Sequence, residues 1–457
     1  MQLMFFTERG YYPIPEDEVI KKRSFFGLSN SHFDAEQGAR LLNEYIDDKI
    51  YCEELGFDGV ALNEHHGTPY CLGAVMDVEA AVLARATKRV KIVLIGNPLP
   101  VVANPLRLAE EVAMIDLISG GRLVPGIIRG TGCEQLFNNA NPALNRELFD
   151  EAHDLMIKAW TVPGPFRFEG KHFNYRFVNP WVLPLQKPHP PIWVPGVISP
   201  ETVAWSAKRR YTYVALSTRL EPTLDLWNLY VKTAAEEGYQ AGPENFVYMQ
   251  PVFCAETEAQ AEDFGRRFLY GGGFAFFGRS EWMFPPGYNS KAATRRMAEL
   301  ANQRTNIWGG AEGESGQGAN ETKIDGDLQM AMGRDPRNDA EVELVKKAIY
   351  AQYPELLKSR QMIAGTPKSV LVKLRHLLRV LQPGVLIMRI DGPMTREERR
   401  SCIRLLGEEV VPALREYGAE LGLDDPFTRK PGMRPLAAGV KPAPVGDASA
   451  LRDLYTC

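Results

Sequence analysis

Short runs of apolar residues alternate along the chain with longer segments in which apolar residues recur at every third or fourth position. A short apolar run predicts a buried strand, whereas the longer period predicts an amphipathic helix. The pattern predicts eight strands, at residues 3–7, 59–62, 90–95, 123–128, 192–194, 213–216, 246–254 and 385–390. It predicts helices at residues 36–55, 76–87, 105–118, 145–160, 200–207, 222–237, 258–269, 340–357, 368–381 and 395–417.

The alternation of strands and helices indicates a parallel sheet. Eight strands favour a sheet closed into a (β/α)₈ TIM barrel over an open sheet, in a domain that spans residues 1–424. A predicted hairpin at residues 166–177, which turns at Glu169-Gly170, interrupts the alternation. Asn104 is the expected N-cap of the helix that begins at Pro105.

Residues 255–384 separate the last two predicted strands and are far more numerous than one crossover requires. We interpret about 271–340 as an insertion before the last strand, which either closes as an apolar lid over the site or packs its own core. The aromatic residues that would form this lid are Phe274, Phe276, Phe277, Trp282 and Phe284. Residues 425–457 contain five prolines and are expected to form an extended C-terminal tail that frays or wraps a neighbouring subunit.

In a barrel of this kind the chemistry lies at the C-terminal ends of the strands. Arg129 closes the fourth predicted strand within Gly126-Ile-Ile-Arg-Gly-Thr-Gly132. A guanidinium beside glycines suits a phosphate, because its donors bind two oxygens and the glycines allow a close approach. A surface arginine in a turn would have the same local sequence. Arg122 lies at the opposite end of this strand and is interpreted as structural.

Gly196 to Thr202 closes the fifth predicted strand and begins a helix. Ser199 is the expected N-cap, and Thr202 lies beside the free backbone N–H groups of the first turn, so this segment is either an anion site or an ordinary helix cap. Asn97 begins Asn97-Pro-Leu-Pro100 after the third strand. That segment is either a packed proline turn or a backbone segment lying against a planar ring.

Asn63-Glu64-His65-His66 closes the second predicted strand. An imidazole is the usual general acid or base near neutral pH, although a histidine in a barrel loop can also be structural. Adjacent residues at a strand end point apart, and no third ligand lies at a suitable spacing, so no metal site is predicted. Three further histidines are interpreted as structural: His153, His172 and His189.

The chain has 457 residues and a formal net charge of −4, which argues against nucleic acid and anionic membranes as partners. No two cysteines lie within four residues of each other, so no CxxC pair exists. The cysteines are Cys52, Cys71, Cys133, Cys254, Cys402 and Cys457. There is no recognisable secretion signal and no apolar run of membrane-spanning length, so a cytoplasmic protein is expected.

Several segments together resemble the bacterial luciferase-like flavin-dependent monooxygenases. They are Asn63-Glu-His-His66, the run from Pro105-Leu-Arg-Leu-Ala-Glu-Glu through Ser119-Gly-Gly-Arg122 to Gly126-Ile-Ile-Arg-Gly130, and Ser199-Pro-Glu-Thr202. Gly365-Thr-Pro-Lys-Ser-Val370 and Val410-Val-Pro412 resemble the C-terminal part of the family. The resemblance covers roughly residues 1–270 and 360–417 and is most specific at residues 119–130.

The resemblance implies that flavin mononucleotide (FMN) binds at the mouth of the barrel. Its phosphate would be held by Arg129, Ser199 and Thr202, and its ring would lie near Asn97. Gly130 and Gly196 would also lie beside the cofactor, and a cis peptide bond is expected near Gly96-Asn97. The implied catalytic residue is His65, which assists the reaction of the flavin peroxide, with His66 and Glu64 as supporting residues.

The resemblance further implies a flavin-dependent monooxygenase in which reduced FMN and O₂ form a C4a-peroxide that oxidises a small organic substrate. Reduced FMN would come from a separate NAD(P)H:flavin reductase, because the chain has no nicotinamide-binding glycine motif of its own. A homodimer is expected by analogy with the family. Ile128 stands where light-emitting members have a cysteine, and the segment after Gly130 lacks the aromatic residue that they have there. Both departures argue against aldehyde-dependent light emission.

Three alternatives remain open. A barrel of this kind can bind a deazaflavin and transfer hydride without oxygen, but the Glu-His-His element argues against it because deazaflavin does not activate oxygen. The chain could instead be a non-catalytic flavin-binding partner subunit, against which the intact His65 and Arg129 argue. A metal-dependent barrel hydrolase is opposed by the missing third ligand.

Overall fold

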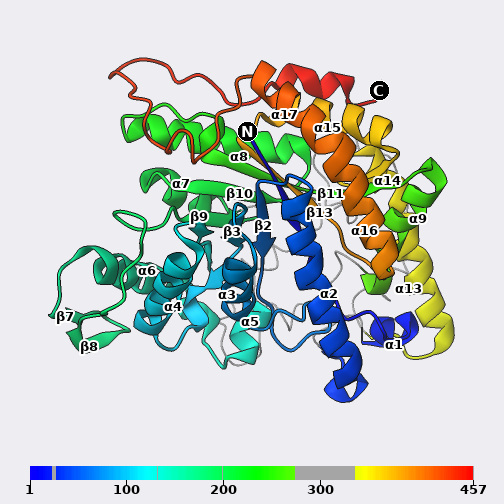
Figure 1. Cartoon of the computed structure of the whole chain (residues 1–457), viewed down its shortest axis with the longest axis horizontal. Helices are drawn as coiled ribbons and strands as arrows, with labels where there is room; N and C mark the ends of the chain where they lie inside the picture. Colours follow the sequence, from blue (N-terminus) through cyan, green and yellow to red (C-terminus); the bar gives the residue numbers. More distant parts are fainter. Residues whose placement is uncertain (23–26, 131, 198, 273–334, 456–457) are drawn as a thin grey trace.

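Eight parallel strands form a barrel in the computed structural model of the chain, which describes residues 1–22, 27–130, 132–197, 199–272 and 335–455 (Figure 1). The sheet has the order β5-β3-β2-β1-β13-β11-β10-β9. A parallel bridge between Gly126 and Trp193, beside a hydrogen bond from Trp193 N to Pro125 O (3.0 Å), joins its two ends. The predicted (β/α)₈ barrel is confirmed. Its strands are β1 (Gln2–Phe6), β2 (Gly59–Leu62), β3 (Lys91–Leu94), β5 (Leu123–Val124), β9 (Trp193–Gly196), β10 (Thr212–Leu216), β11 (Phe246–Cys254) and β13 (Val385–Arg389).

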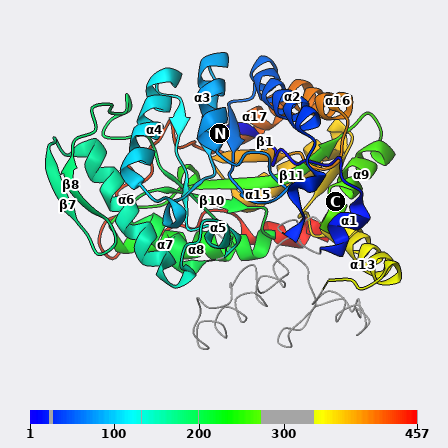
Figure 2. The same ribbon diagram turned by 90° about the horizontal axis from the view of Figure 1, so that it is seen from below.

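Helices surround the barrel (Figures 1 and 2). The helix predicted at residues 395–417 is present, but a π-turn at Leu406–Val410 divides it into α16 and α17. Within the described ranges, no helix is both long and apolar enough to cross a membrane. The surrounding helices are α2 (Ala35–Glu54), α3 (Met76–Ala86), α4 (Pro105–Ser119), α6 (Asn145–Thr161), α7 (Pro200–Lys208), α8 (Leu220–Glu236), α15 (Pro367–Leu381), α16 (Arg396–Leu405) and α17 (Val411–Glu420).

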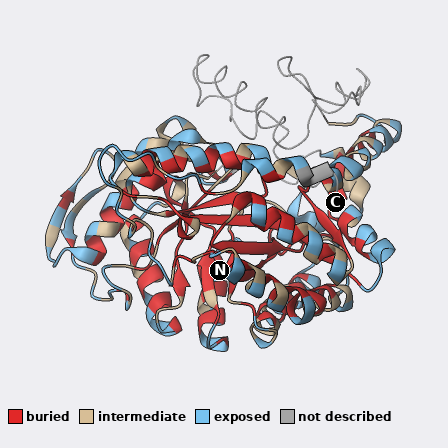
Figure 3. Cartoon of the chain, turned by 90° about the horizontal axis from the view of Figure 1, so that it is seen from above, coloured by how far each residue is buried: buried red, intermediate tan, exposed pale blue. Residues whose placement is uncertain are grey.

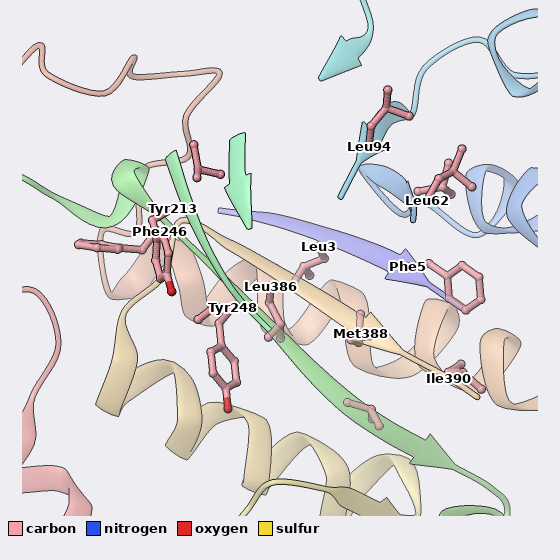
Figure 4. Packing of buried hydrophobic residues seen from close by; sticks show 14 of the residues in the cluster. Leu3, Phe5, Leu62, Leu94, Tyr213, Phe246, Tyr248, Leu386, Met388 and Ile390 are labelled. Atoms are coloured by element: carbon pink, nitrogen blue, oxygen red, sulfur yellow. The ribbon is translucent and has the colours of Figure 1, made fainter. Parts of the chain in front are cut away.

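Successive residues of each strand contribute to two different cores, because side chains alternate between the faces of a sheet. On β1, Leu3 and Phe5 pack outward with residues of the helices (Figure 4). The helices are correspondingly buried on the side that faces the barrel and exposed on the other (Figure 3). The barrel interior is filled by Met4, Phe6, Ala61, Val93, Ile95, Val124, Trp193, Val214, Val247, Met249, Val385 and Ile387. Fully burying one large apolar side chain contributes about 1.5–3 kcal/mol.

Arg122 has the structural role that the sequence predicts. Its guanidinium donates to Thr87 Oγ1 (2.8 Å) and to the carbonyl oxygens of Ala84 (2.8 Å) and Val90 (2.9 Å). It thereby satisfies carbonyl groups at the C-terminal end of α3. The prediction for Asn104 is also confirmed, since its Oδ1 accepts from the backbone N–H of Arg107 at 3.1 Å.

Several short elements were not predicted, because their apolar runs are too brief to show a period. They are α1 (Glu16–Lys21), β4 (Asn97–Pro98), α5 (Gly132–Phe137) and β12 (Ile363–Gly365), while β6 (Ile127–Ile128) lies within a predicted strand. The strand predicted at residues 123–128 is therefore two short pieces, β5 and β6. The predicted hairpin is present as β7 (Phe166–Glu169) and β8 (Asn174–Val178), and the helix predicted at residues 258–269 as α9 (Glu258–Arg267).

The end of β11 extends past the barrel and pairs with β12. The helix predicted at residues 340–357 is divided into α13 (Asp339–Ala351) and α14 (Tyr353–Lys358). Helix α13 packs beside α1, where Lys346 Nζ lies 3.0 Å from Asp17 Oδ1 and Tyr350 donates to Glu16 Oε1 at 2.7 Å. The five aromatic residues of the predicted lid lie outside the described residues.

The described part of the C-terminal tail packs on its own barrel, which corrects the expectation that it frays; the alternative that it also wraps a neighbouring subunit stays a prediction. Phe427 stacks on Trp193 with ring centroids 6.0 Å apart, and Lys91 Nζ lies 4.7 Å from the Phe427 centroid. Because Trp193 and Lys91 begin their strands, this contact covers the N-terminal end of the barrel. Farther along, Arg434 pairs with the buried Glu244 at 2.8 Å. The proline-rich composition of the tail did not reveal these individual contacts of Phe427 and Arg434.

We expect Phe427→Ala to lower the free energy of unfolding by about 2 kcal/mol. This is less than the 3–5 kcal/mol typical of a buried phenylalanine, because Phe427 is only partly buried. Phe177→Ala, which removes a ring that is 64% exposed, should change stability by less than about 0.5 kcal/mol. Chemical denaturation of the three proteins checks this, and equal stabilities would contradict the role assigned to the tail.

Candidate functional site

The folded barrel brings Arg129, Ser199 and Thr202 together at its mouth. Arg129 follows β6, and Ser199 is the N-cap of α7, the helix that follows β9. Arg129 Nη2 donates to Ser199 Oγ at 2.8 Å and to Thr202 Oγ1 at 3.1 Å. In the structure these three side chains, which the sequence pattern assigned separately to an anion site, form one group, which we call the anion cluster. A guanidinium, two hydroxyls and the first turn of a helix together make an environment suited to a phosphate.

Two glycines beside this cluster disfavour a side chain, Gly130 because of its left-handed backbone and Gly196 because of a close neighbour. Gly130 has φ +71°, and a Cβ on Gly196 would lie 2.8 Å from the Tyr213 hydroxyl. Tyr213 is fully buried, and its hydroxyl has no hydrogen-bond partner in the described part of the chain. Burial raises the pKa of Tyr213, and the nearby charge of Arg129 opposes that shift. Tyr213 was missed in the sequence because it lies inside an apolar strand and looks like a core residue.

Asn97 lies where two backbone segments approach very closely. It begins β4, which pairs with β6, and its N–H donates to Gly126 O at 2.8 Å. The expected cis peptide bond is present one bond earlier, between Ile95 and Gly96. The Asn97 side chain is buried, and within the described residues its Nδ2 has no hydrogen-bond partner. A buried amide with an unused donor is suited to binding a polar ligand group.

His65 is held between two acidic side chains. Its Nδ1 lies 2.8 Å from Glu134 Oε1, and its Nε2 lies 3.8 Å from Glu8 Oε2. Burial lowers the pKa of His65, but the hydrogen bond to Glu134 and the charges of Glu134 and Glu8 outweigh burial and raise its pKa overall. Neither acidic residue was predicted. Glu8 directly follows the first strand, which was a usable signal, whereas Glu134 lies on a short helix without a recognisable pattern.

His66 and Glu64 form a separate pair beside His65. His66 Nε2 lies 3.1 Å from Glu64 Oε1, and Glu64 Oε2 accepts from the backbone N–H of Met76, the first residue of α3, at 3.2 Å. The His66 ring stacks on Phe137 with centroids 5.0 Å apart. Burial lowers the pKa of His66, and the hydrogen bond and charge of Glu64 more than reverse that shift. The geometry fits a supporting role for both residues.

Helix α5 connects the two clusters. Glu134 contacts His65, and its neighbour Gln135 donates from Nε2 to the Arg129 carbonyl at 3.0 Å. The anion cluster and the segment of His65 and His66 therefore adjoin the same short helix. Elsewhere His153 contacts the Tyr211 hydroxyl at 2.9 Å and His172 contacts Glu147 Oε2 at 2.9 Å, as structural histidines do. Across the described residues, no group of three or more His, Cys, Asp or Glu side chains is placed to hold a metal ion.

Comparison with known proteins places the chain in a family. The sequence profile of the luciferase-like monooxygenases matches residues 29–376, and the chain belongs to this family. It is 27% identical over 222 residues to the alkanal monooxygenase alpha chain of the Kryptophanaron alfredi symbiont, covering 48% of this chain and 60% of that protein. Matches to the first curated relatives span between 55% and 65% of those proteins.

Two solved structures share the fold at low sequence identity. The oxygenating constituent of 3,6-diketocamphane monooxygenase from Pseudomonas putida, in complex with FMN, aligns with a TM-score of 0.59 at 17% identity, covering 90% of this chain and 99% of that one. The coenzyme F420-dependent tetrahydromethanopterin reductase of Methanopyrus kandleri aligns with a TM-score of 0.57 at 15% identity, covering 90% and 98%. The barrel alone therefore does not distinguish a flavin from a deazaflavin.

The anion cluster predicts that inorganic phosphate stabilises the protein, since a ligand bound only to the folded state shifts unfolding. At ten times its dissociation constant, phosphate should contribute about 1.4 kcal/mol, which raises Tm by roughly 1.5 °C, because the entropy of unfolding of so large a domain is high. Arg129→Ala should abolish the effect. Arg167→Ala, which removes an arginine paired with Glu169 on the hairpin, should keep it. Equal Tm shifts in both variants would contradict the assignment.

Proposed function

We propose that the chain is the oxygenase component of an FMN-dependent monooxygenase, which uses reduced FMN and O₂ to oxidise a small organic substrate. The observation that carries the proposal is the cluster of Arg129, Ser199 and Thr202, which α5 connects to His65. One end of this site suits a phosphate, and the other suits proton transfer. Membership of the luciferase-like monooxygenase family supports the same conclusion.

The residues present fit FMN. Its phosphate would be held by Arg129, Ser199 and Thr202, which the structure already places within hydrogen-bonding distance of one another. Its ring would lie near Asn97, whose buried Nδ2 has an unused donor in the described part of the chain. Gly130 and Gly196 would keep the approach to the phosphate free of side chains. When bound in its reduced form, FMN supplies the activation of O₂ that no amino-acid side chain provides.

The residues of the chain would bind, orient and move a proton. His65 would exchange a proton at Nε2, since Nδ1 is engaged by Glu134. The raised pKa of His65 keeps a protonated form available near neutral pH. Glu64 and His66 would hold the His65 segment in place, because Glu64 connects it to the start of α3. Most of the His65 side chain is buried, with 17% exposed, which limits contact with bulk water.

A deazaflavin-dependent hydride transfer is the second candidate, favoured by the structural likeness to the F420-dependent reductase. A phosphate cluster would serve either cofactor. The paired histidines argue for the oxygen-using reaction, because hydride transfer to a carbonyl needs one proton donor and no oxygen activation. The naming of the P. putida relative as an oxygenating constituent supports a separate NAD(P)H:flavin reductase as partner.

We expect Arg129→Ala to weaken binding of reduced FMN about 10- to 100-fold, since a hydrogen bond to a charged group contributes about 1.5–3 kcal/mol. Binding of reduced riboflavin, which has no phosphate, should change less than about twofold because the lost contact is absent there too. Arg167→Ala is the matched control. Anaerobic titration followed by flavin absorbance checks this. If the wild-type protein binds a reduced deazaflavin but not reduced FMN, the FMN proposal is wrong.

We also propose a homodimer, supported by an unusual apolar surface on α3 and α4. These helices lie side by side (Figures 1 and 2), yet several of the exposed residues on them are large and apolar. The exposed fractions are 54%, 66% and 44% for Val75, Val78 and Val82, and 51%, 45% and 48% for Met114, Leu117 and Ile118. An exposed apolar patch of this kind is typical of an interface. Exposed Arg85 and Arg107 and half-exposed Glu111 at its edge carry both signs of charge, which suits self-complementary contact between two copies.

We expect the double variant Val78→Asp, Leu117→Asp to be monomeric where the wild type is a dimer, because the charges would be buried in the contact. Val372→Asp changes a similarly exposed valine on α15 (51%) and should leave the dimer intact. Sedimentation velocity at micromolar concentration measures the three masses. A wild-type monomer, or a double variant that still dimerises, would contradict the proposed interface.

A further inference from the structure

The two acidic neighbours of His65 are not equivalent. Both oxygens of Glu8 already have other partners: Asn63 Nδ2 donates to its Oε2, and Arg389 Nη2 lies 3.1 Å from its Oε1. Its distance to His65 Nε2, 3.8 Å, is too long for a hydrogen bond. Glu134 instead approaches the ring at 2.8 Å. Of these two carboxyl groups, only Glu134 therefore forms a hydrogen bond with the His65 ring, as its acceptor.

Glu134 is a buried carboxyl group directed at His65. Its side chain is 2% exposed, and in the described residues its second oxygen, Oε2, has no hydrogen-bond partner. A buried carboxylate is costly unless a donor or a cation compensates it. Here the compensating partner that the structure gives is the His65 ring. The arrangement thus stabilises a ring that carries a hydrogen at Nδ1 and, more strongly, a ring that carries two hydrogens and a positive charge.

We propose that Glu134 is a positioning residue that fixes the Nδ1–H form of His65 and leaves Nε2 as the atom that gains and releases the catalytic proton. An ionised carboxylate only accepts hydrogen bonds, so Nδ1 must donate to it. In the neutral ring Nε2 is then unprotonated, and it faces Glu8 Oε2. Protonation at Nε2 places a positive charge between two acidic groups. The catalytic part of this inference rests on the proposed monooxygenase function, whereas the pairing itself does not.

Other charged and titratable groups around the ring set the size of the effect. Arg9 opposes protonation of His65 by charge repulsion, while Glu8 favours it. His66, the next residue, also repels a positive charge on His65, and the Tyr70 ring lies 5.8 Å from the His65 ring between centroids. Glu134 is the only one of these groups that makes a hydrogen bond to His65. Removing its charge should therefore lower the pKa of His65 without altering the other neighbours.

The test is an NMR titration of the full chain with histidine labelled at Cε1. The chain has seven histidines, and the His65→Asn variant identifies the His65 resonance. In Glu134→Gln we expect the titration midpoint of His65 to fall by about one pH unit or more, because a neighbouring opposite charge shifts a pKa by about 1–3 units. Glu134→Asp keeps the charge at a shorter reach, and its midpoint should lie between those of Glu134→Gln and the wild type.

Glu147→Gln is the matched control, because Glu147 contacts His172 at 2.9 Å on the surface. It removes a carboxylate–histidine contact elsewhere in the chain and should leave the titration of His65 unchanged. An unchanged His65 midpoint in folded Glu134→Gln would overturn the inference. If Glu134→Gln does not fold, the Glu134→Asp titration decides instead, and a midpoint equal to the wild type would overturn it.

Reduced FMN affinity, measured on the same samples, separates this inference from the proposed function. Glu134→Gln should bind reduced FMN within about twofold of the wild type, because Glu134 does not belong to the phosphate cluster. A lowered His65 midpoint with unchanged FMN binding supports both proposals. A lowered midpoint in a protein that binds no FMN at all supports the Glu134 pairing and rejects the flavin function. An unchanged midpoint in a protein that binds FMN rejects only the role of Glu134.

Discussion

The close approach of backbone segments at Gly126 is the constraint on which the site depends. A Cβ at this position would lie 2.0 Å from the carbonyl oxygen of Leu94, so no other residue fits. The same glycine accepts the hydrogen bond from Asn97 N and forms a parallel bridge with Trp193 at the start of β9. It therefore connects the third, fourth and fifth strands of the barrel at once. Arg129 follows three residues later, which directs its side chain toward the N-terminus of α7.

A second constraint is the concentration of buried charge at the mouth. Arg389, Glu8 and Asp391 are all buried, and the Arg389 Nε lies 2.5 Å from Asp391 Oδ2. Buried ions are tolerated only where partners compensate each of them. Here the partners come from the ends of β1 and β13, which are adjacent in the sheet. The parallel arrangement that makes the barrel stable thus also supplies the neighbours that allow Glu8 to remain near His65.

The sequence predicted the barrel and the residues of the anion cluster, because both leave strong local signals. Apolar runs marked each strand, and Arg129 and Ser199 stand at strand ends beside glycine or a helix cap. Glu134 and Tyr213 could not be found in this way. Glu134 lies on a helix too short to show a period, and the position of the Tyr213 hydroxyl beside Gly196 follows only from the pairing of β9 with β10 in the folded sheet. The packing of the tail through Phe427 was missed because composition describes flexibility on average and does not reveal a single anchoring ring.

Under the proposed function, the arrangement around α5 separates recognition of the phosphate from proton transfer. Gln135 faces the Arg129 segment and Glu134 faces His65, so consecutive residues of one helix contact two clusters with different tasks. An anion cluster needs a permanent positive charge, which arginine supplies at any physiological pH. A proton-transfer group needs a charge that changes, which histidine supplies. Had these groups been direct neighbours, the arginine would have lowered the pKa of the histidine. Placing a carboxylate on the histidine side of the helix has the opposite effect and keeps the proton available where it is used.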